Sequence, residues 1–381
     1  MENVEKIIGE NGTLIRLKGR MDSGNVEAIE EAIGEVKEPI TIDLEELEYT
    51  SSAGLRLILK IKKANAETKV INASSEVYEV FEMTGFTEMM EVKKAYRKVS
   101  VEGCEIIGRG ANGAVYRLDA DTVVKVYIND DSLEAIQHER EVAKLAFVLG
   151  VPTAMSYDVV KVGGHYASMF EMIDAKSFAN LLSEPGVDID RLAKEYASLV
   201  KLIHSTHVPE GRLPSKKEAE RRCIEALKGR IPQESFDKLL RLFESIPETD
   251  TMLHCDLHVK NLMMTKDGVM LIDMDTLAVG HPIFEWASVW NAYVGYNVVD
   301  PGNASKFFEA PGWALNRFYE RSFASYWGRD DEEFLKRKEA QASIVGLPHV
   351  IDHYIRHKKT LEAELSTKKL IALLDVVDSL D

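Results

Sequence analysis

The side chains best suited to chemistry gather in one stretch, LHCDLHVKNLMMTKDGVMLIDMD, at residues 253–275. Asp256 stands two residues after His254, Asn261 follows five residues later, and Asp273 ends a short apolar run. Charged and amide groups are costly to bury without partners, so they either stay in solvent or converge on a ligand. The KDG turn predicts a β-hairpin that brings Asn261 and Asp273 together.

Phosphoryl transfer is a reaction that uses this set of groups. Asp256 would be the base or orienting carboxylate for a substrate hydroxyl, while Asn261 and Asp273 would supply the hard oxygen ligands that Mg²⁺ prefers. We expect His254 to brace the loop rather than to titrate in catalysis. Asp275 would lie on the same side of an extended strand as Asp273. There it would bind a second metal ion, receive a substrate amine, or simply be solvated.

A glycine-rich segment offers a place for phosphates. Gly108, Gly110 and Gly113 form G-x-G-x-x-G, which in a dinucleotide fingerprint would open a helix. Here the glycines are followed by AVYRL, the turn DADT and VVKVY, which predict strand, turn and strand. A glycine-rich hairpin with a lysine on the next strand is the kinase arrangement, and Lys125 fits that place. Alternatively, Lys125 could be a surface lysine at a strand end. The valines on both sides of Lys125 favour a lysine inside a hydrophobic strand, and such a lysine needs an anion as partner.

The next predicted helix, SLEAIQHEREVAKLAFVLG, carries two candidates for that anion, Glu139 and Glu141. Residues two apart on a helix point in different directions, so only one can face the lysine. The apolar face is expected to pass beside Glu141, which is therefore the preferred partner, with Glu139 as the solvated alternative. The ion pair would hold the ammonium of Lys125 against the nucleotide phosphates.

Two further strands are predicted in VPTAMSYDVVKVGGHYASMFEMIDAKSF, and they lead to a hinge. Backbone groups from Glu171 to Ile173 would bind the edge of a purine, with Phe170 packed behind it. Side chains such as Phe170 and Met172 fit an ordinary core equally well. ATP is the expected nucleotide, and GTP remains an alternative.

The motifs HCDLHVKN, LIDMD and GHPIFEWASVW resemble the aminoglycoside and choline phosphotransferases, the small-molecule branch of the protein-kinase-like fold. The resemblance covers about residues 100–300, with a helical tail to 381. It implies an α+β bilobal domain over 101–381, with an N-lobe to about residue 173 and a C-lobe from 174. Protein kinases usually carry Asp-Phe-Gly where this chain has Asp-Met-Asp, and the small-molecule branch tolerates that variation. By resemblance, the nucleotide, metal and base roles fall to Lys125, Glu141, Asp256, Asn261 and Asp273.

The first hundred residues follow a different pattern. TLIRLKG and PITIDL are typical of strands, and GNVEAIEEAIGEV, AGLRLILKIKKAN and SEVYEVFEMTGF show helical spacing of apolar residues. A charged segment, KKAYRKVSVEG, separates this region from the glycine-rich one. Alternating strands and helices predict a sheet covered by helices.

Two serines precede the second of these helices in LEYTSSAGLRLIL. Ser51 or Ser52 would make a good N-cap, or one of them is a phosphorylation switch at a helix N-terminus. The segments ITIDLEELEYTSSAGLRLIL and VINASSEVYEVFEMTGFTEMMEV resemble the STAS family of anti-sigma-factor antagonists, over nearly all of residues 1–98. The resemblance implies an α/β domain with a mixed sheet, a protein partner such as an anti-sigma factor, and phosphorylation at the position of Ser52. Many members have Asp where this chain has Ser51.

Bulk properties limit the remaining classes. A chain of 381 residues predicts two or three domains, and a net charge of −16 argues against nucleic-acid binding. No apolar run is long enough to span a membrane, and the acidic N-terminus lacks the features of a secretory signal. Cys104, Cys223 and Cys255 lie far apart without metal-ligand spacing, so we expect reduced thiols in a cytoplasmic protein.

Three functions compete at this point. The favoured one is a small-molecule kinase whose STAS module responds to a partner or ligand; the others are a protein serine kinase and a scaffold that only binds nucleotide. Retention of the lysine, both aspartates and the asparagine argues against the scaffold. The acceptor is not identified, because the aromatic residues of the C-terminal helices suit either a cationic ligand or a core: Trp313, Phe318, Tyr319, Tyr326, Trp327 and Tyr354.

Overall fold

The computed structural model describes residues 3–9, 12–36, 39–110, 113–129 and 132–380. Contacts divide the chain into two compact units. The first unit is Met1–Glu102 with Val159–Ala167, and the second is Gly103–Asp158 with Ser168–Asp381.

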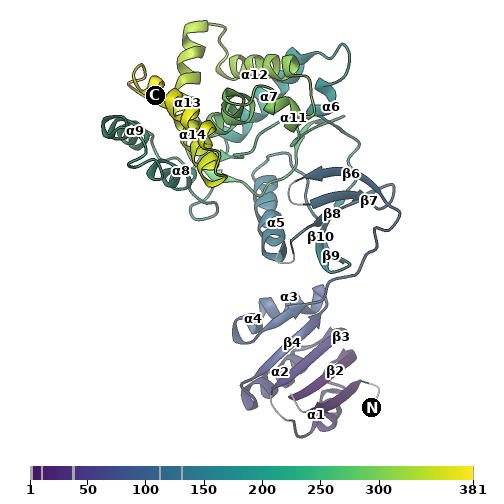
Figure 1. Cartoon of the computed structure of the whole chain (residues 1–381). Coiled ribbons are helices and arrows are strands. Elements are labelled where there is room, and N and C mark those ends of the chain that lie inside the picture. The colour runs from purple at the N-terminus through teal and green to yellow at the C-terminus, as the bar shows by residue number, and fades with distance from the viewer. Residues whose placement is uncertain (1–2, 10–11, 37–38, 111–112, 130–131, 381) are drawn as a thin grey trace. The chain divides into compact units, whose positions relative to one another are not determined.

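The N-terminal part of the first unit contains a five-stranded sheet in the order β1-β2-β3-β4-β5 (Figure 1). β1 and β2 pair antiparallel, whereas β2 to β5 run parallel, so the sheet is mixed as predicted. The strands are β1 (Val4–Gly9), β2 (Gly12–Met21), β3 (Ile40–Thr50), β4 (Thr68–Ala73) and β5 (Val92–Lys94). The helices are α1 (Val26–Ile33), α2 (Ser52–Ala64), α3 (Ser75–Met83) and α4 (Phe86–Met89).

Alternation builds the core of this sheet. Thr13, Ile15 and Leu17 of β2 alternate as buried residues, and Ile15 and Leu17 form one apolar cluster with Ile58 of α2 and Phe81 of α3. The sequence predicts one helix over 75–86, but the structure ends α3 at Met83 and starts α4 at Phe86. Gly85 between them has φ +76°, a left-handed conformation that interrupts helical hydrogen bonding and that glycine adopts readily.

The small lobe of the kinase-like fold follows. Its sheet has the order β6-β7-β8-β10-β9, and the helix α5 (Ser132–Val148) comes after β8. The strands are β6 (Glu105–Gly110), β7 (Gly113–Arg117), β8 (Thr122–Tyr127), β9 (Asp158–Val162) and β10 (His165–Glu171). β6, β7 and β8 pair antiparallel in sequence, which is the predicted glycine-rich hairpin followed by the lysine strand.

The large lobe is mostly helical (Figure 1). Its helices are α6 (Phe178–Leu182), α7 (Ile189–His204), α8 (Lys216–Glu225), α9 (Gln233–Ser245), α10 (Ile283–Trp290), the π-helix η1 (Asn291–Gly295), the 3₁₀ helix η2 (Tyr296–Val298), α11 (Asn303–Phe308), α12 (Gly312–Trp327), α13 (Glu332–Arg356) and α14 (Thr360–Leu374). Its short strands are β11 (Lys176–Ser177), β12 (Met252–Leu253), β13 (Leu262–Thr265), β14 (Gly268–Leu271) and β15 (Ala278–Val279). One large apolar cluster, which includes Phe178, Tyr196, Trp286 and Phe318, holds these helices around β12 to β14.

None of the helices that the structure describes has the length and apolarity that are needed to cross a membrane.

Candidate active site

Lys125 of β8 stands between two carboxylates from different parts of the second unit. Its Nζ lies 3.1 Å from Glu139 Oε1 on α5 and 2.6 Å from Asp273 Oδ1 in the large lobe. The hydroxyl of Tyr127 donates to the other Glu139 oxygen at 2.6 Å. The side chain of Lys125 is 18% exposed and that of Asp273 is 38% exposed, so a mostly buried lysine links the small lobe to the large one.

The charge of this lysine is secured by its surroundings. Burial by itself disfavours an ammonium, but the carboxylates of Glu139 and Asp273 raise the pKa of Lys125 above its usual range. Burial together with the Glu139 carboxylate also raises the pKa of Tyr127, which therefore stays a hydrogen-bond donor. The two carboxylates therefore favour the protonated form of Lys125.

The predicted pairing of Lys125 with Glu141 is wrong. Glu139 is 8% exposed and contacts the lysine, whereas Glu141 is exposed to solvent. The buried face of α5 contains Ile136, Glu139, Val142, Ala143 and Ala146, at the three- and four-residue spacing of one helix side. Two residues away from Glu139, Glu141 points off that face.

The three glycines of the hairpin have different surroundings. A Cβ atom on Gly113 would lie 2.0 Å from the carbonyl oxygen of Val126, so only glycine lets β7 approach β8 this closely. Gly110 has nothing within 4 Å of its Cβ position, and Gly108 makes only ordinary contact with Val115. The tip of the hairpin, residues 111–112, lies outside the described residues.

The loop between β12 and β13 holds Asp256 beside Asn261. The amide nitrogen of Asn261 donates to the carbonyl oxygen of Asp256 at 3.0 Å and to its carboxylate at 3.2 Å. The predicted hairpin is present: β13 and β14 pair antiparallel, and the N–H of Ile272 donates to the carbonyl oxygen of Asn261 at 3.0 Å. The two ends that carry Asn261 and Asp273 are therefore neighbours, as the KDG turn predicts.

Asp275 does not stand where an extended strand would put it. Asp273 has φ +65°, a left-handed conformation that is uncommon outside glycine, so the chain turns between the two aspartates. Asp275 is exposed, while Lys125 contacts Asp273 alone of the two. Partial desolvation and the nearby Asp273 carboxylate raise the pKa of Asp275.

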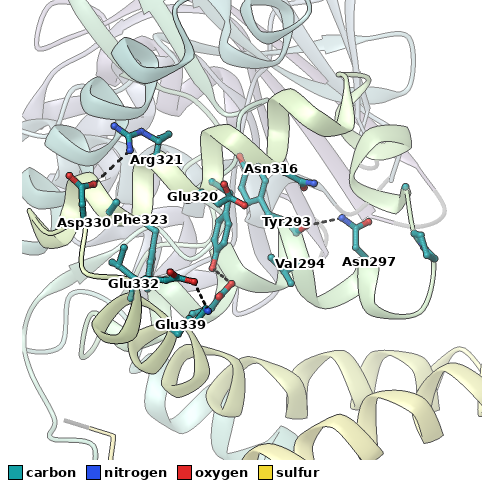
Figure 2. Close-up of a pocket in the computed structure, with 16 residues that line it drawn as sticks. Tyr293, Val294, Asn297, Asn316, Glu320, Arg321, Phe323, Asp330, Glu332 and Glu339 are labelled. Carbon is teal, nitrogen blue, oxygen red and sulfur yellow. Dashed lines mark hydrogen bonds and ion pairs between the residues drawn. The ribbon is translucent and has the colours of Figure 1, made fainter.

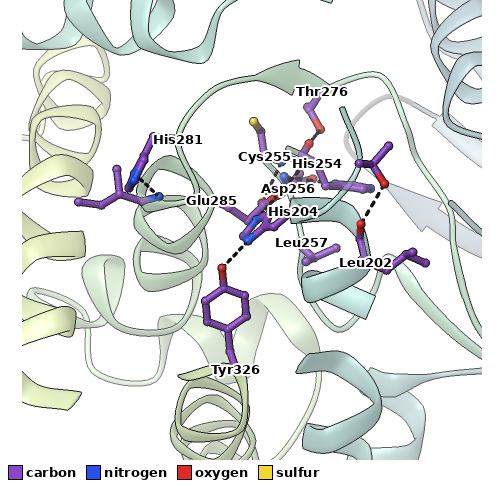
Figure 3. Close-up of polar contacts among 12 residues, drawn as sticks. Leu202, His204, His254, Cys255, Asp256, Leu257, Thr276, His281, Glu285 and Tyr326 are labelled. Atoms are coloured by element: carbon purple, nitrogen blue, oxygen red, sulfur yellow. Dashed lines mark hydrogen bonds and ion pairs between the residues drawn. The ribbon is translucent and has the colours of Figure 1, made fainter. Parts of the chain in front are cut away.

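Glu285 of α10 anchors the loop, a role that the sequence did not reveal (Figure 3). Its carboxylate accepts backbone N–H groups of His254 at 2.6 Å and Cys255 at 2.9 Å, and the residue is 0% exposed. On its other side, the Nε2 atom of His204 lies 3.9 Å away, and His204 Nδ1 lies 2.8 Å from the Tyr326 hydroxyl. Although burial favours the neutral acid, His204 and the loop lower the pKa of Glu285.

His254 itself lies in this frame. It is fully buried, its carbonyl oxygen accepts the hydroxyl of Thr276 at 2.7 Å, and its Nδ1 lies 3.4 Å from the N–H of Asp256. Each of these contacts is internal to the loop region (Figure 3). The histidine side chain is placed to hold the turn that carries Asp256.

Tyr293, in η1, joins this loop to a large cavity. Its hydroxyl accepts the N–H of Val259 at 3.1 Å, and its ring stacks on Tyr319 with centroids 5.8 Å apart. Both tyrosines line a cavity of about 900 Å³ between η1, α12 and the start of α13 (Figure 2). Its charged lining residues are Glu320, Asp330, Glu332, Glu339, Arg321 and Lys336, an acidic excess. Sequence reasoning missed Tyr293 because its partner is a backbone group 34 residues away.

The predicted hinge is only partly available. The N–H of Met172 donates to the carbonyl oxygen of Asp121 at 2.7 Å. Glu171 ends β10 with an exposed side chain, and Ile173 is half-buried in the following segment. The backbone N–H of Met172 is therefore already bonded within the protein.

The serines of the first unit have distinct positions at the start of α2. Ser51 is the N-cap, and its hydroxyl accepts the N–H of Ala53 at 3.2 Å. Ser52 is the first helical residue and is exposed. A Cβ on Gly54 would lie 2.6 Å from the Thr50 hydroxyl oxygen and 2.8 Å from Met21, so glycine is required where the helix meets the sheet.

Comparison with known proteins places both parts of the chain. Residues 103–321 match the family model described as "Phosphotransferase enzyme family", and residues 3–100 match that of the STAS domain. A comparison with curated protein sequences gave no match.

Solved structures with a similar fold include several aminoglycoside phosphotransferases. APH(2")-IIia with GDP and kanamycin is 15% identical with a TM-score of 0.47, covering 78% of this chain and 97% of that chain. ADP-bound APH(2'')-Ib is 14% identical with a TM-score of 0.48, covering 78% and 98%. APH(3'')-Id from Streptomyces rimosus is 15% identical with a TM-score of 0.39, covering 64% and 93%. Because the first family model spans more than half of the residues, this chain belongs to the phosphotransferase enzyme family, with a STAS domain preceding the phosphotransferase region.

Proposed function

We propose that residues 101–381 transfer the γ-phosphate of a Mg²⁺-bound purine nucleotide, ATP or GTP, to a hydroxyl of a small molecule, and that residues 1–98 regulate this activity. The observation that carries the proposal is the 2.6 Å contact between Lys125 and Asp273, which sets a phosphate-binding cation beside a metal-binding carboxylate. Phosphoryl transfer requires mainly positioning and charge neutralisation, and this cluster supplies both.

The nucleotide would lie along the hairpin of Gly108, Gly110 and Gly113. Lys125 would contact its phosphates while Glu139 keeps the ammonium in place, and the backbone of Glu171 and Ile173 would bind the purine. The open space around the Cβ position of Gly110 supports a close approach of phosphate to the backbone there.

Asn261 and Asp273 are a fitting donor set for Mg²⁺. Asn261 is 5% exposed and its amide nitrogen is held by Asp256, which leaves its carbonyl oxygen for a ligand. Both side chains offer hard oxygen atoms, the type that Mg²⁺ selects. When bound, the ion would neutralise charge on the transferring phosphate. The exposed Asp275 is a candidate for a second ion or a substrate amine.

Asp256 would accept the proton of the attacking hydroxyl. The acceptor oxygen then bonds to the γ-phosphorus, the bond from that phosphorus to the bridging oxygen breaks, and the nucleoside diphosphate leaves. The Asp256 side chain is 45% exposed, so an acceptor can reach it, while the bonds from Glu285 to the loop hold its backbone.

Asp256→Asn tests this assignment. We expect Mg²⁺-nucleotide binding to stay within twofold and phosphate transfer to fall about 10²–10⁴-fold, as for loss of a general base. Asp267→Asn, in the exposed hairpin turn, is the matched control and should turn over normally. Normal turnover by Asp256→Asn would refute the base assignment.

Asp273→Ala tests the metal site. The substitution should weaken nucleotide binding only when Mg²⁺ is present, and an equal loss of binding in EDTA would remove Asp273 from the metal site.

The acceptor is proposed to be a cationic alcohol, such as an amino sugar or amino alcohol. The cavity beside Tyr293 combines an acidic excess with aromatic rings, which together attract ammonium groups. A panel of aminoglycosides, amino alcohols and neutral sugars tests the class. Glu320→Gln should raise the KM for a cationic acceptor, whereas Glu234→Gln on α9 should leave it unchanged. Preference for neutral sugars would contradict the proposal.

For the STAS domain, we propose binding of a protein partner, such as an anti-sigma factor, controlled by phosphorylation of Ser52. The exposed hydroxyl at a helix N-terminus supports this, because a phosphate there gains from the free N–H groups and the helix dipole. Incubation with labelled ATP and partner kinases, followed by mapping of the label, tests it. Label on Ser51, or on neither serine, would contradict the assignment.

A further inference from the structure

A second cluster of reactive side chains lies between α8 and α13, and the proposed phosphoryl transfer does not use it. Glu220 and Cys223 are three residues apart on α8, so they share a helix face. His349 reaches them from α13, directly after Pro348. One ligand atom from each of the three side chains lies within 4.8 Å of the other two.

The two carboxylate oxygens of Glu220 have different surroundings. Its Oε1 pairs with the ammonium of Lys216 at 2.8 Å. Its Oε2 is buried and has no hydrogen-bond partner among the described residues, and the residue is 7% exposed. His349 Nδ1 lies 3.7 Å from Oε2, which is within ion-pair range but too long for a hydrogen bond. A buried carboxylate oxygen that accepts no hydrogen bond is costly unless a further group binds it.

The geometry brings three different donor types to one point. His349 Nδ1 lies 3.9 Å from the Cys223 Sγ atom and 3.7 Å from Glu220 Oε2. A nitrogen, a sulfur and a carboxylate oxygen therefore face one another across the gap between α8 and α13.

We propose that Glu220 Oε2, Cys223 Sγ and His349 Nδ1 bind a zinc-type divalent cation, with water as the fourth ligand. One sulfur, one nitrogen and one oxygen donor suit Zn²⁺ and do not suit Mg²⁺ or Ca²⁺. Tetrahedral Zn²⁺ with ordinary bond lengths needs ligand atoms roughly 3.4–3.6 Å apart. The Nδ1 to Oε2 and Nδ1 to Sγ distances are 3.7 and 3.9 Å, and all three ligand atoms lie within 4.8 Å of one another, so the side chains would have to move closer together to bind the ion.

Binding would displace any proton from Cys223 Sγ and His349 Nδ1, because only a thiolate and an unprotonated ring nitrogen bind metal. Lys216 would remain on Oε1 as the outer partner that orients the carboxylate. His349 has a side chain that is 40% exposed, which gives the ion a route from solvent. The ion would fasten α8 to α13.

The test uses the full-length protein after chelator treatment. Titration with Zn²⁺ should show one tight equivalent per chain, and Co²⁺ should produce a thiolate-to-metal absorption band. Cys223→Ser should abolish the band and weaken Zn²⁺ binding more than the about 10–100-fold that loss of an outer partner costs. Cys104→Ser, a thiol in the other lobe, should change neither. Absence of tight Zn²⁺ binding, or an unchanged band in Cys223→Ser, would overturn the site.

Alkylation of the wild-type protein covers the case in which Cys223→Ser fails to fold. Iodoacetamide labelling, followed by peptide mass spectrometry, measures each thiol separately. Zn²⁺ should slow labelling of Cys223 at least tenfold while Cys104 labels at its original rate. Equal labelling of Cys223 with and without Zn²⁺ would also overturn the site.

Discussion

In the kinase-like unit, Glu139 and Glu285 are buried carboxylates that each receive two donors, whereas the start of α2 in the STAS domain displays two serine hydroxyls and no acidic residue in its first turn. Buried charges must be fully paired, and that pairing fixes their geometry. An exposed hydroxyl at a helix start is fixed only by the backbone and stays open to modification. The first arrangement holds neighbouring groups in place, and the second leaves a hydroxyl open, as the proposed phosphorylation of Ser52 requires.

The largest expected loss of stability comes from Glu139→Gln, which removes the charge of a paired carboxylate in the kinase-like unit. Lys125 would keep Asp273 but lose the charge of its second carboxylate, and Tyr127 would lose a charged acceptor, so the cost should approach the lower end of the about 3–5 kcal/mol for a broken buried pair. Chemical denaturation measures the stability, and turnover should fall as the lysine loses its position. Glu141→Gln is the matched control and should stay within about 0.5 kcal/mol of wild type. Equal effects from both variants would restore Glu141 as a partner.

Glu285→Gln should have the next largest effect. We expect it to lower the free energy of unfolding by about 2–3 kcal/mol, because one of the two loop N–H groups loses a charged acceptor. The sign of the pH effect is fixed: the folded-state pKa of Glu285 is lowered, so its contribution is present above the unfolded value of about 4.3 and is lost as pH falls through the folded value. Denaturation curves between neutral and acid pH should show a smaller acid-dependent loss of stability for the Glu285→Gln variant than for wild type. Identical pH profiles would show that the carboxylate is not the acceptor that matters.

Gly54→Ala tests whether the STAS helix start is fixed by packing. The added Cβ meets the Thr50 hydroxyl and Met21, and overpacking of this kind costs about 1–3 kcal/mol. Gly9→Ala has only an ordinary contact at 3.7 Å and should change thermal stability little. A stable Gly54→Ala protein would mean that α2 can shift on the sheet.

The smallest effect separates the two serines. Ser51→Ala removes the N-cap hydrogen bond and should cost about 1 kcal/mol, while Ser52→Ala should be nearly neutral. Thermal unfolding of the two variants gives the comparison directly. A larger loss from Ser52→Ala would assign the structural role to the serine that we propose as the phosphorylation site.

Much of the fold was predictable because it rests on local patterns. Alternation in TLIRLKG gave the buried residues of β2, and the turn signals at DADT and KDG gave two antiparallel pairings. An apolar strand around Lys125 correctly indicated a lysine with an anionic partner. Each of these signals involves residues close together in sequence.

The errors arose where tertiary contacts decide. The buried face of α5 includes Val142 and Leu145 as expected, but it continues through Glu139 and not beside Glu141, so the wrong glutamate was preferred. The left-handed backbone at Asp273 redirected Asp275, and nothing in LIDMD announces a positive φ. Glu285 was missed because its partners are main-chain groups about thirty residues away, and the Glu220–Cys223–His349 cluster was missed because His349 comes from a distant helix.

The position of Tyr293 matters for any attempt to change which acceptor the protein would use. One end of this side chain supports the backbone of Val259, three positions beyond the proposed base, while its ring forms a wall of the acidic cavity. If the cavity binds the acceptor as we propose, a substitution of Tyr293 should change both acceptor preference and the support of the Val259 backbone. Changes aimed at acceptor preference alone should therefore begin at the carboxylates Glu320, Asp330 and Glu332, which line the same cavity.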